Sequence, residues 1–339
     1  MKLIFKWTAG LILILSSFLV SSYNYCVGDY NYDSSQKFDS FDSFYQYELE
    51  ISKKENTRPE NEELLVRYSD EKTPIAILYV HGFGASRKEG DEVTNKISEY
   101  FGANTYYVRL PGHGTNMEDH LNTDFTKYLQ DVETSLIQVR SLGHKTVVIG
   151  TSMGGMISTY LAAKHPELVD CLILASPFYD FADPSAHLFR FHWGKSFINA
   201  VMGEIRISKK DPKDEAGKYW YMDQYYAAIQ NILNLKRFID RENPFPNVKA
   251  PVLLMYYYKS EREQDFTASV PAMLKAFEKI QSGNSPNPQN KLLQVEGGAH
   301  VLLSKYVKTD KPFIENAMIN FIKETTGAEE TKGLKKTKR

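Results

Sequence analysis

The sequence predicts an α/β fold, in which a mostly parallel β-sheet is covered by helices on both faces. Apolar runs of strand length alternate along the chain with segments whose apolar residues recur at helical spacing. Several runs are apolar at consecutive positions, as expected for strands that are buried on both faces. One such run ends in "VVIGTSMGGM", residues 147–156, where glycines stand on both sides of a serine.

The overall composition is that of a globular protein with a packed core. The chain has 339 residues, enough for one large domain or two smaller ones. Its 41 basic and 42 acidic residues nearly cancel, so we expect no nucleic-acid binding, which would need a basic excess. The two cysteines, Cys26 and Cys171, make no disulfide framework. Cys171 lies in "LVDCLILAS" and is expected to be a buried thiol.

The first 22 residues resemble a targeting segment. Lys2 and Lys6 precede the apolar run "LILILSSFLV", whose length is typical of a signal peptide, and small residues allow cleavage after Ser22. A retained membrane anchor is one alternative, although the run is short for a spanning helix. Lipidation at Cys26 is another, disfavoured by the bulky residues before it. We expect export across a membrane, with the product secreted, periplasmic or tethered by its N-terminus.

The predicted elements follow in order. A helix is expected from Phe125, with Thr123 as its N-cap, because apolar residues form a one-sided stripe there. Further helices are expected over 156–164 and 313–322. The expected strands begin at Pro74, Asn104, Lys145, Leu168, Ala250 and Lys291.

These elements divide the chain into a core and an insertion. Residues 46–177 and 250–325 are expected to form the α/β core. Residues 178–249 carry no strand signal but many aromatic residues, and a bare loop of this length is improbable, so we expect a helical cap. Residues 23–45 are predicted to be a linker or arm, and 326–339 a disordered basic tail.

The glycines around Ser152 indicate a sharp strand-to-helix turn. Gly150 and Gly154 lack a Cβ atom, so the strand and the helix can approach closely. Such a turn presents the serine hydroxyl above the carboxyl edge of the sheet, the arrangement called a nucleophile elbow. The backbone N–H of Met153 would then point into the site.

A serine nucleophile needs a histidine base and a carboxylate that orients it. On this fold both follow the serine in the chain, with the acid first. His300, in "EGGAHVLL" after the last strand, is the predicted base. His165 is too far along the helix that the serine begins, and His187 and His192 fall in the cap.

The sequence offers three candidates for the acid. It should follow the strand that begins at Ala250, where Glu261, Glu263 and Asp265 are the candidates. Asp265 lies just before a helix that is expected to begin near Pro271, where an acid loop normally ends. We therefore predict Asp265, with Glu261 as the main alternative.

The oxyanion formed during attack needs backbone N–H donors. Met153 is predicted to supply one and Phe83 the other, because Gly82 and Gly84 let that loop approach the substrate. His81, which precedes the loop, is expected to make a structural hydrogen bond.

Together these residues resemble the α/β-hydrolase superfamily, and within it the carboxylesterase and monoacylglycerol-lipase-like branch. The resemblance covers about residues 74–322 and rests on the motifs "HGFGAS", "RLPGHGTN", "GTSMGG" and "GGAHVLL". It implies an α/β-hydrolase fold and a serine hydrolase that cleaves small-molecule or lipid esters without a cofactor or metal. It also implies that Ser152 is the nucleophile, His300 the base, and Phe83 and Met153 the oxyanion donors. The family usually has a glycine after the acid strand and an Asp a few residues on, and this chain departs from that pattern.

Two other functions remain open from the sequence. A proline-type aminopeptidase or amide hydrolase would need acidic cap residues to hold the substrate amine, and the cap contains Asp180, Asp183, Glu204 and Asp223. A non-catalytic exported binding protein would keep the fold without turnover.

Overall fold

The computed structural model describes residues 16–17, 20–23, 28–208 and 214–331. Its centre is an eight-stranded sheet in the order β1-β3-β2-β4-β5-β8-β10, with β9 paired to β8. β1 and β9 are antiparallel to their neighbours, and the other pairings are parallel. The strands are β1 Leu64–Val66, β2 Thr73–Val80, β3 Asn104–Tyr107, β4 Gly143–Thr151, β5 Cys171–Ala175, β8 Val252–Ser260, β9 Glu263–Gln264 and β10 Lys291–Val295. The predicted α/β class is confirmed, and each expected strand is present.

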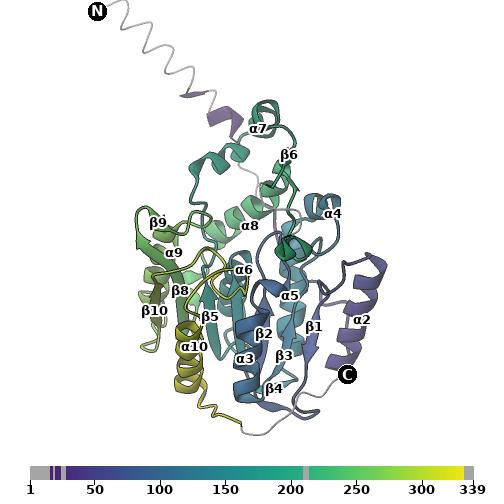
Figure 1. Ribbon diagram of the computed structural model, residues 1–339, viewed down its shortest axis with the longest axis vertical. Coiled ribbons are helices and arrows are strands. Elements are labelled where there is room, and N and C mark those ends of the chain that lie inside the picture. Colours follow the sequence, from purple (N-terminus) through teal and green to yellow (C-terminus); the bar gives the residue numbers. More distant parts are fainter. Residues whose placement is uncertain (1–15, 18–19, 24–27, 209–213, 332–339) are drawn as a thin grey trace, which may run out of the picture.

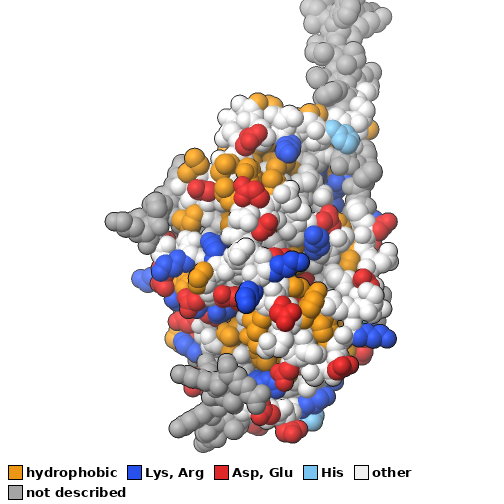
Figure 2. Space-filling model, turned by 90° about the vertical axis from the view of Figure 1, so that its right-hand side faces the viewer, with side chains coloured by type: hydrophobic (Ala, Val, Ile, Leu, Met, Phe, Trp, Pro, Cys, Tyr) orange, Lys and Arg blue, Asp and Glu red, His pale blue; other side chains and the backbone are white. Residues whose placement is uncertain are grey.

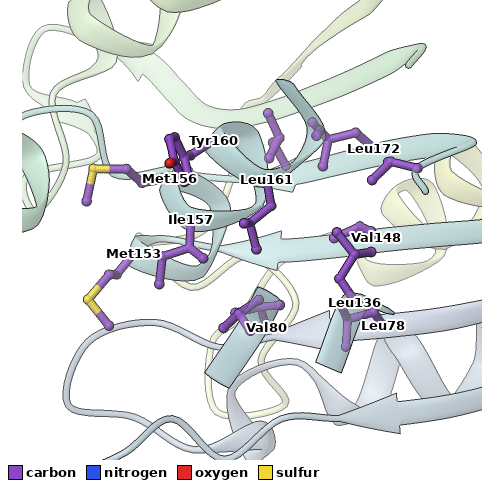
Figure 3. Close-up of a cluster of buried hydrophobic side chains, with 14 of the residues drawn as sticks. Leu78, Val80, Leu136, Val148, Met153, Met156, Ile157, Tyr160, Leu161 and Leu172 are labelled. Carbon is purple, nitrogen blue, oxygen red and sulfur yellow. The ribbon is translucent and has the colours of Figure 1, made fainter. Parts of the chain in front are cut away.

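Helices cover both faces of this sheet (Figure 1). Consecutive residues of β2 point to opposite faces of the sheet. Leu78 packs in one buried cluster with α2, α5, α6, α8 and α9, whereas Ile77 packs in a second cluster with α3 and α10. Figure 3 shows α6 lying on the sheet in the first cluster, where Ile157 and Leu161 point toward Val80 and Val148. The helices are α2 Phe41–Lys54, α3 Asp91–Phe101, α4 Met117–Asn122, α5 Phe125–Val139, α6 Met153–Lys164, α7 Gly194–Met202, α8 Ile229–Glu242, α9 Val270–Gln281 and α10 Lys311–Thr326.

The segment predicted to be a linker is ordered in its second half. α2 begins at Phe41, inside the predicted 23–45 arm, and Ser40 forms a capping box at its start. The rings of Phe41 and Phe44 lie 5.2 and 5.5 Å from that of Tyr106 on β3. The linker prediction was wrong here because the echo "FDSFDSF" places its phenylalanines at helical spacing.

The cap lies above the carboxyl ends of the strands (Figure 1). It contains α7, α8 and short 3₁₀ turns, and also the two-stranded ribbon β6 (Ile205–Arg206) and β7 (Gln224–Tyr225). The expectation of a purely helical cap was therefore wrong, since strands of two residues leave no periodic signal. α9 begins at Val270 with Pro271 in its first turn, as predicted.

Several terminal and capping predictions need correction or lie outside the described residues. Asp124, not Thr123, caps α5, and its carboxylate accepts the Thr126 N–H at 2.9 Å. Part of the predicted tail is packed: Ala328 is buried, and the Thr331 N–H donates to the Tyr100 carbonyl. Residues 332–339 and Cys26 lie outside the described part of the chain, as does most of the predicted signal segment.

Residues 20–23 lie beside α7 at the top of the cap (Figure 1). The Ser22 carbonyl accepts the His192 N–H at 2.9 Å, and the Ser22 hydroxyl accepts the indole N–H of Trp193 at 3.1 Å. The Tyr23 ring packs edge-on against Phe191. Within the described residues, the structure contains no helix with the length and apolar character needed to cross a bilayer.

Candidate active site

Ser152 is the residue at the turn between β4 and α6. Its backbone has φ 53° and ψ −120°, a conformation that a residue with a side chain rarely adopts and that costs of order 1–3 kcal/mol. The Ser152 N–H donates to the Ala175 carbonyl, and the Phe178 N–H donates to the Ser152 carbonyl. These bonds to the β5 segment hold the strained residue in place.

The glycines beside Ser152 are required by close backbone approach. A Cβ on Gly150 would lie 2.7 Å from the Gly155 Cα, and one on Gly154 would lie 2.1 Å from the Val80 carbonyl oxygen. A Cβ on Gly155 would meet Pro177 at 2.9 Å. The strand and helix approach closely at this turn, as the sequence predicts.

The structure brings the three predicted triad residues together. The Ser152 Oγ lies 2.7 Å from the Nε2 of His300, and the Nδ1 of His300 lies 2.6 Å from the Oδ2 of Asp265. A carboxylate accepts hydrogen bonds only, so Nδ1 carries the proton and Nε2 is free to accept the Ser152 hydroxyl proton. This is the tautomer that a general base requires.

Two further hydrogen bonds fix Asp265. Its Oδ1 accepts the backbone N–H groups of Thr267 and Ala268 at 2.8 and 3.0 Å, and the residue is 2% exposed. Burial by itself lowers the pKa of His300, but the charge and hydrogen bond of Asp265, with the charge of Glu89, raise it above the ordinary histidine value. The site therefore stabilises the imidazolium that forms when His300 takes a proton.

A β-hairpin places the acid at Asp265 rather than directly after the strand β8. β8 continues to Ser260, and β9 folds back on it with a shift in register, so the chain returns to the site at Asp265. The Asp265 N–H donates to the Tyr257 carbonyl. Glu261 accepts a hydrogen bond from the Tyr258 hydroxyl, and Glu263 pairs with Lys259, so neither alternative acid contacts His300.

His81 orients the loop that contains Phe83. Its Nε2 accepts the Leu110 N–H at 3.2 Å, so Nδ1 carries the proton and donates to the Gly82 carbonyl at 2.8 Å. In a trans peptide the carbonyl and the following N–H point in opposite directions, so the Phe83 N–H points away from His81. Burial lowers the pKa of His81 to about 4, which keeps the ring neutral in this structural role.

The second predicted oxyanion donor is the first residue of α6. The Met153 N–H belongs to the first turn, where no intrahelical carbonyl is available, and the helix dipole favours negative charge at this end. Phe83 and Ser152 both border one cavity, so the two predicted donors belong to loops that meet at the nucleophile.

The cavity above Ser152 has a volume of about 570 Å³ and is lined mainly by apolar and aromatic side chains. Its walls come from the cap and from the loops that follow the strands. Members of this lining include Phe178, Phe181, Phe189, Ile198, Trp220, Met222, Ile232, Phe266 and Val307.

The motif "LPGHG" packs directly behind the oxyanion loop. The His113 ring lies 5.2 Å from that of His81 and 6.0 Å from that of Phe83. The Tyr221 hydroxyl of the cap donates to the Gly112 carbonyl, which ties the cap to this motif. The pairing of "HGFG" with "LPGHG" in the sequence therefore reflects a direct contact.

Two of the other histidines downstream of Ser152 are engaged elsewhere. His165 lies 2.8 Å from Glu133, and His187 lies 3.1 Å from Asp180. Sequence analysis missed one residue of the site, Glu89, which is buried and borders the cavity beside Ser152. No sequence pattern distinguishes it from the neighbouring charged residues of "SRKEGDE".

Comparison with known proteins identifies the fold. A solved structure of the metagenome-derived lipolytic enzymes LipS and LipT matches with a TM-score of 0.60 at 21% identity, covering 79% of this chain and 99% of that one. A soluble variant of monoglyceride lipase from Saccharomyces cerevisiae matches with a TM-score of 0.57 at 16% identity, covering 80% and 92%. The fold is that of an α/β-hydrolase.

Sequence comparisons agree with this α/β-hydrolase fold. The model of the family described as serine aminopeptidase, S33, matches residues 72–231. The chain is 33% identical to a thermostable monoacylglycerol lipase of Bacillus sp. (strain H-257), over 29% of this chain and 39% of that protein. It is 32% identical to a monoglyceride lipase homolog of Monkeypox virus, over 44% and 56%. The matches thus span about two fifths to just over half of these relatives, and the chain resembles monoacylglycerol-lipase-like esterases.

Proposed function

We propose that this α/β-hydrolase is a serine hydrolase that cleaves carboxylic esters through an acyl-enzyme on Ser152. The observation that carries the proposal is the hydrogen-bonded series Asp265–His300–Ser152, with spacings of 2.6 and 2.7 Å, at the base of an apolar cavity. The resemblance to lipases and esterases supports the same reaction.

The geometry suggests a two-step mechanism. The Ser152 Oγ attacks the ester carbonyl carbon while His300 Nε2 takes the hydroxyl proton, and the carbonyl oxygen becomes an oxyanion facing the Phe83 and Met153 N–H groups. The oxyanion collapses, the bond to the alcohol oxygen breaks, and His300 returns its proton to the leaving alcohol. Water then repeats the sequence on the acyl-enzyme and releases the carboxylic acid. No cofactor or metal takes part in this scheme.

The lining of the cavity favours an ester with an apolar acyl chain. Its volume of about 570 Å³ lies within the range of small-molecule sites. The aromatic cap side chains would remove the acyl chain from water, which stabilises binding in proportion to the apolar area covered. A monoacylglycerol or a similar small lipid ester fits this description best.

The acidic cap residues do not favour an aminopeptidase. Asp183 alone of the four candidates borders the cavity, and its carboxylate caps a 3₁₀ turn by accepting the Ser185 N–H. Asp180 is engaged with His187 and Lys236. Asp223 accepts the Ser208 N–H. Among the described residues, these side chains form no common pocket for an amine.

The proposal is tested with p-nitrophenyl esters of increasing acyl length, a monoacylglycerol, and an aminoacyl anilide of similar size. Wild type is expected to hydrolyse the esters, and Ser152→Ala should lower kcat by several orders of magnitude. A fluorophosphonate probe should label wild type but not the variant. Preference for the anilide would support the aminopeptidase alternative, and absence of labelling and turnover would support a non-catalytic binding protein.

We further propose that the protein is exported and acts at a membrane, either released or tethered through its N-terminus. The apolar run over residues 11–20 supports this, and the described residues Ser22 and Tyr23 contact the cap. Figure 2 shows hydrophobic side chains exposed on the cap. Those on α7 and the following segment are Phe197, Val201, Met202, Ile205 and Ile207. Fractionation of cells that express the full chain, before and after removal of residues 1–22, would test this.

A further inference from the structure

Glu89 is a buried carboxylate that the proposed mechanism does not use. It ends the 3₁₀ turn η1, Arg87–Glu89, which follows the oxyanion loop directly. The residue is 2% exposed, yet it borders the same cavity as Ser152 and His300. Buried carboxylates are rare unless they are paired, so its position needs an explanation.

The contacts of Glu89 lead to the oxyanion loop. Its Oε2 accepts the Gly82 N–H at 2.6 Å. A Cβ built on Gly82 would lie 2.9 Å from the Glu89 Oε1 and also 2.9 Å from the Ser152 Cβ. The carboxylate and the nucleophile therefore both border the space where a Gly82 side chain would lie. His81 holds the carbonyl of Gly82 and Glu89 holds its N–H, so this residue is fixed from both sides.

Among the described residues, the charged groups near Glu89 are engaged elsewhere, with the exception of His300. Arg87 and Lys88, in the same turn, pair with Asp91 instead. Tyr79 on β2 is buried, which with the charge of Glu89 raises the pKa of its hydroxyl well above 10, so it stays neutral. His300, on the loop after β10, is the remaining group, and its pKa responds to the charge of Glu89.

We propose that Glu89 is a positioning residue for ester cleavage: through Gly82 it orients the oxyanion loop, and its negative charge favours the imidazolium that forms on His300. This inference rests on the proposed esterase function. Two carboxylates then act on one imidazole, Asp265 by direct contact and Glu89 through its charge. A charged acceptor also binds the Gly82 N–H more strongly than a neutral one does.

Because its charge is needed, Glu89 should add a second ionisation to the reaction. Burial raises the pKa of Glu89 to about 7, although the Gly82 hydrogen bond and the charge of His300 act in the opposite direction. As the pH falls through this region, Glu89 gains a proton and its charge disappears. His300 also becomes protonated as the pH falls and can no longer act as a base. The acid limb of log kcat/KM against pH should therefore be steeper than a slope of one.

The decisive variant is Glu89→Gln, in which the amide oxygen can still accept the Gly82 N–H but the charge is removed. We expect the acid limb to fall to a slope of one and its midpoint to move to lower pH, because His300 loses a neighbouring negative charge. At high pH, kcat should fall about tenfold with little change in KM. Thermal unfolding should occur at the same or a higher temperature, because the variant no longer buries a charge.

Glu92→Gln is the matched control, since it removes the same charge nearby on α3 without bordering the cavity. It should reproduce the wild-type pH profile. If Glu89→Gln does not fold, Glu89→Asp replaces it: an acid limb that stays steeper than one, with a lower kcat, supports the proposal, and a slope of one overturns it.

Several results would overturn the inference about Glu89. Superimposable profiles of log kcat/KM against pH for wild type and Glu89→Gln would reject the inference. A Glu89→Gln variant that is less stable but keeps the wild-type acid limb would also reject it, because Glu89 would then have a purely structural role. All of these tests require that the wild-type protein hydrolyses an ester. If wild type hydrolyses no ester, the proposed function itself fails, which is a distinguishable outcome.

Discussion

Replacing Asp265 by asparagine should inactivate the enzyme while leaving its fold intact. Asp265 accepts three hydrogen bonds, two from backbone N–H groups through Oδ1 and one from His300 through Oδ2. In Asp265→Asn the amide oxygen can replace Oδ1 toward Thr267 and Ala268. The amide NH₂ then faces His300 Nδ1 and donates to it.

This exchange forces the wrong tautomer on His300. A donor at Nδ1 requires that the ring proton move to Nε2, which lies 2.7 Å from the Ser152 Oγ. Nε2 then has no lone pair to accept the serine proton. The corresponding substitution in a well-studied serine protease lowers kcat about 10⁴-fold, and we expect a loss of that order here. Because each factor of ten is about 1.4 kcal/mol, the loss amounts to about 5.5 kcal/mol of transition-state stabilisation.

The assay is hydrolysis of a p-nitrophenyl ester near pH 8, with Glu261→Gln as the control. Glu261 carries the same charge in the same hairpin, but it contacts the Tyr258 hydroxyl and is exposed, so the control should stay within about twofold of wild type. Thermal unfolding of both variants should be close to that of wild type. If Asp265→Asn keeps more than a tenth of the activity, or Glu261→Gln loses most of it, the assignment of the acid is refuted.

Two further predictions concern stability. Gly154→Ala should destabilise the fold by about 3 kcal/mol or more, measured by urea unfolding, because the new Cβ would lie 2.1 Å from the Val80 carbonyl oxygen; an unchanged midpoint would contradict the close approach at this turn. Burial lowers the pKa of His81 to about 4 and that of His120 to about 3, so the unfolded chain binds protons at these rings before the folded chain does. Stability that is present at pH 7 should therefore be lost as the pH falls below about 6.5, by about 3 kcal/mol for each ring at pH 4. The pH dependence of unfolding should be shallower in His120→Gln, and identical slopes would show that His120 does not contribute.

The sheet and the sharp turn at Ser152 could be predicted from the sequence because their signals are local. Strands buried on both faces appear as continuous apolar runs, and the glycines around Ser152 indicate a close approach of strand and helix. His300 was predicted because it follows the last strand, whereas His165 lies at the end of α6 and His187 and His192 lie in the cap. The α/β-hydrolase fold and the resemblance to lipases and esterases agree with these signals.

Features that depend on tertiary contacts could not be predicted from the sequence. Phe41 and Phe44 are aromatic residues in a polar segment, and only the neighbouring surface of Tyr106 turns that segment into part of the core. The sequence favours Asp265 by its position before α9, but the β8–β9 hairpin that turns Glu261 and Glu263 away from His300 could not be predicted, because its second strand has only two residues. Glu89 stands out because it is buried, and burial cannot be recognised in a run of charged residues.

The distribution of charge around the site follows from these contacts. Behind the oxyanion loop, burial lowers the pKa of His81, His113 and His120, so these rings are neutral at pH 7 and none supplies a cation to the oxyanion. In the proposed reaction the oxyanion must then be stabilised by backbone N–H groups, which are fixed in place before the charge develops. The carboxylates, by contrast, lie around His300, where the positive charge appears. Each charge that the reaction creates thus faces groups that are already in position: backbone N–H groups for the oxyanion and carboxylates for the imidazolium. His81 and Glu89 both orient Gly82, which keeps these two sets of groups correctly placed relative to each other.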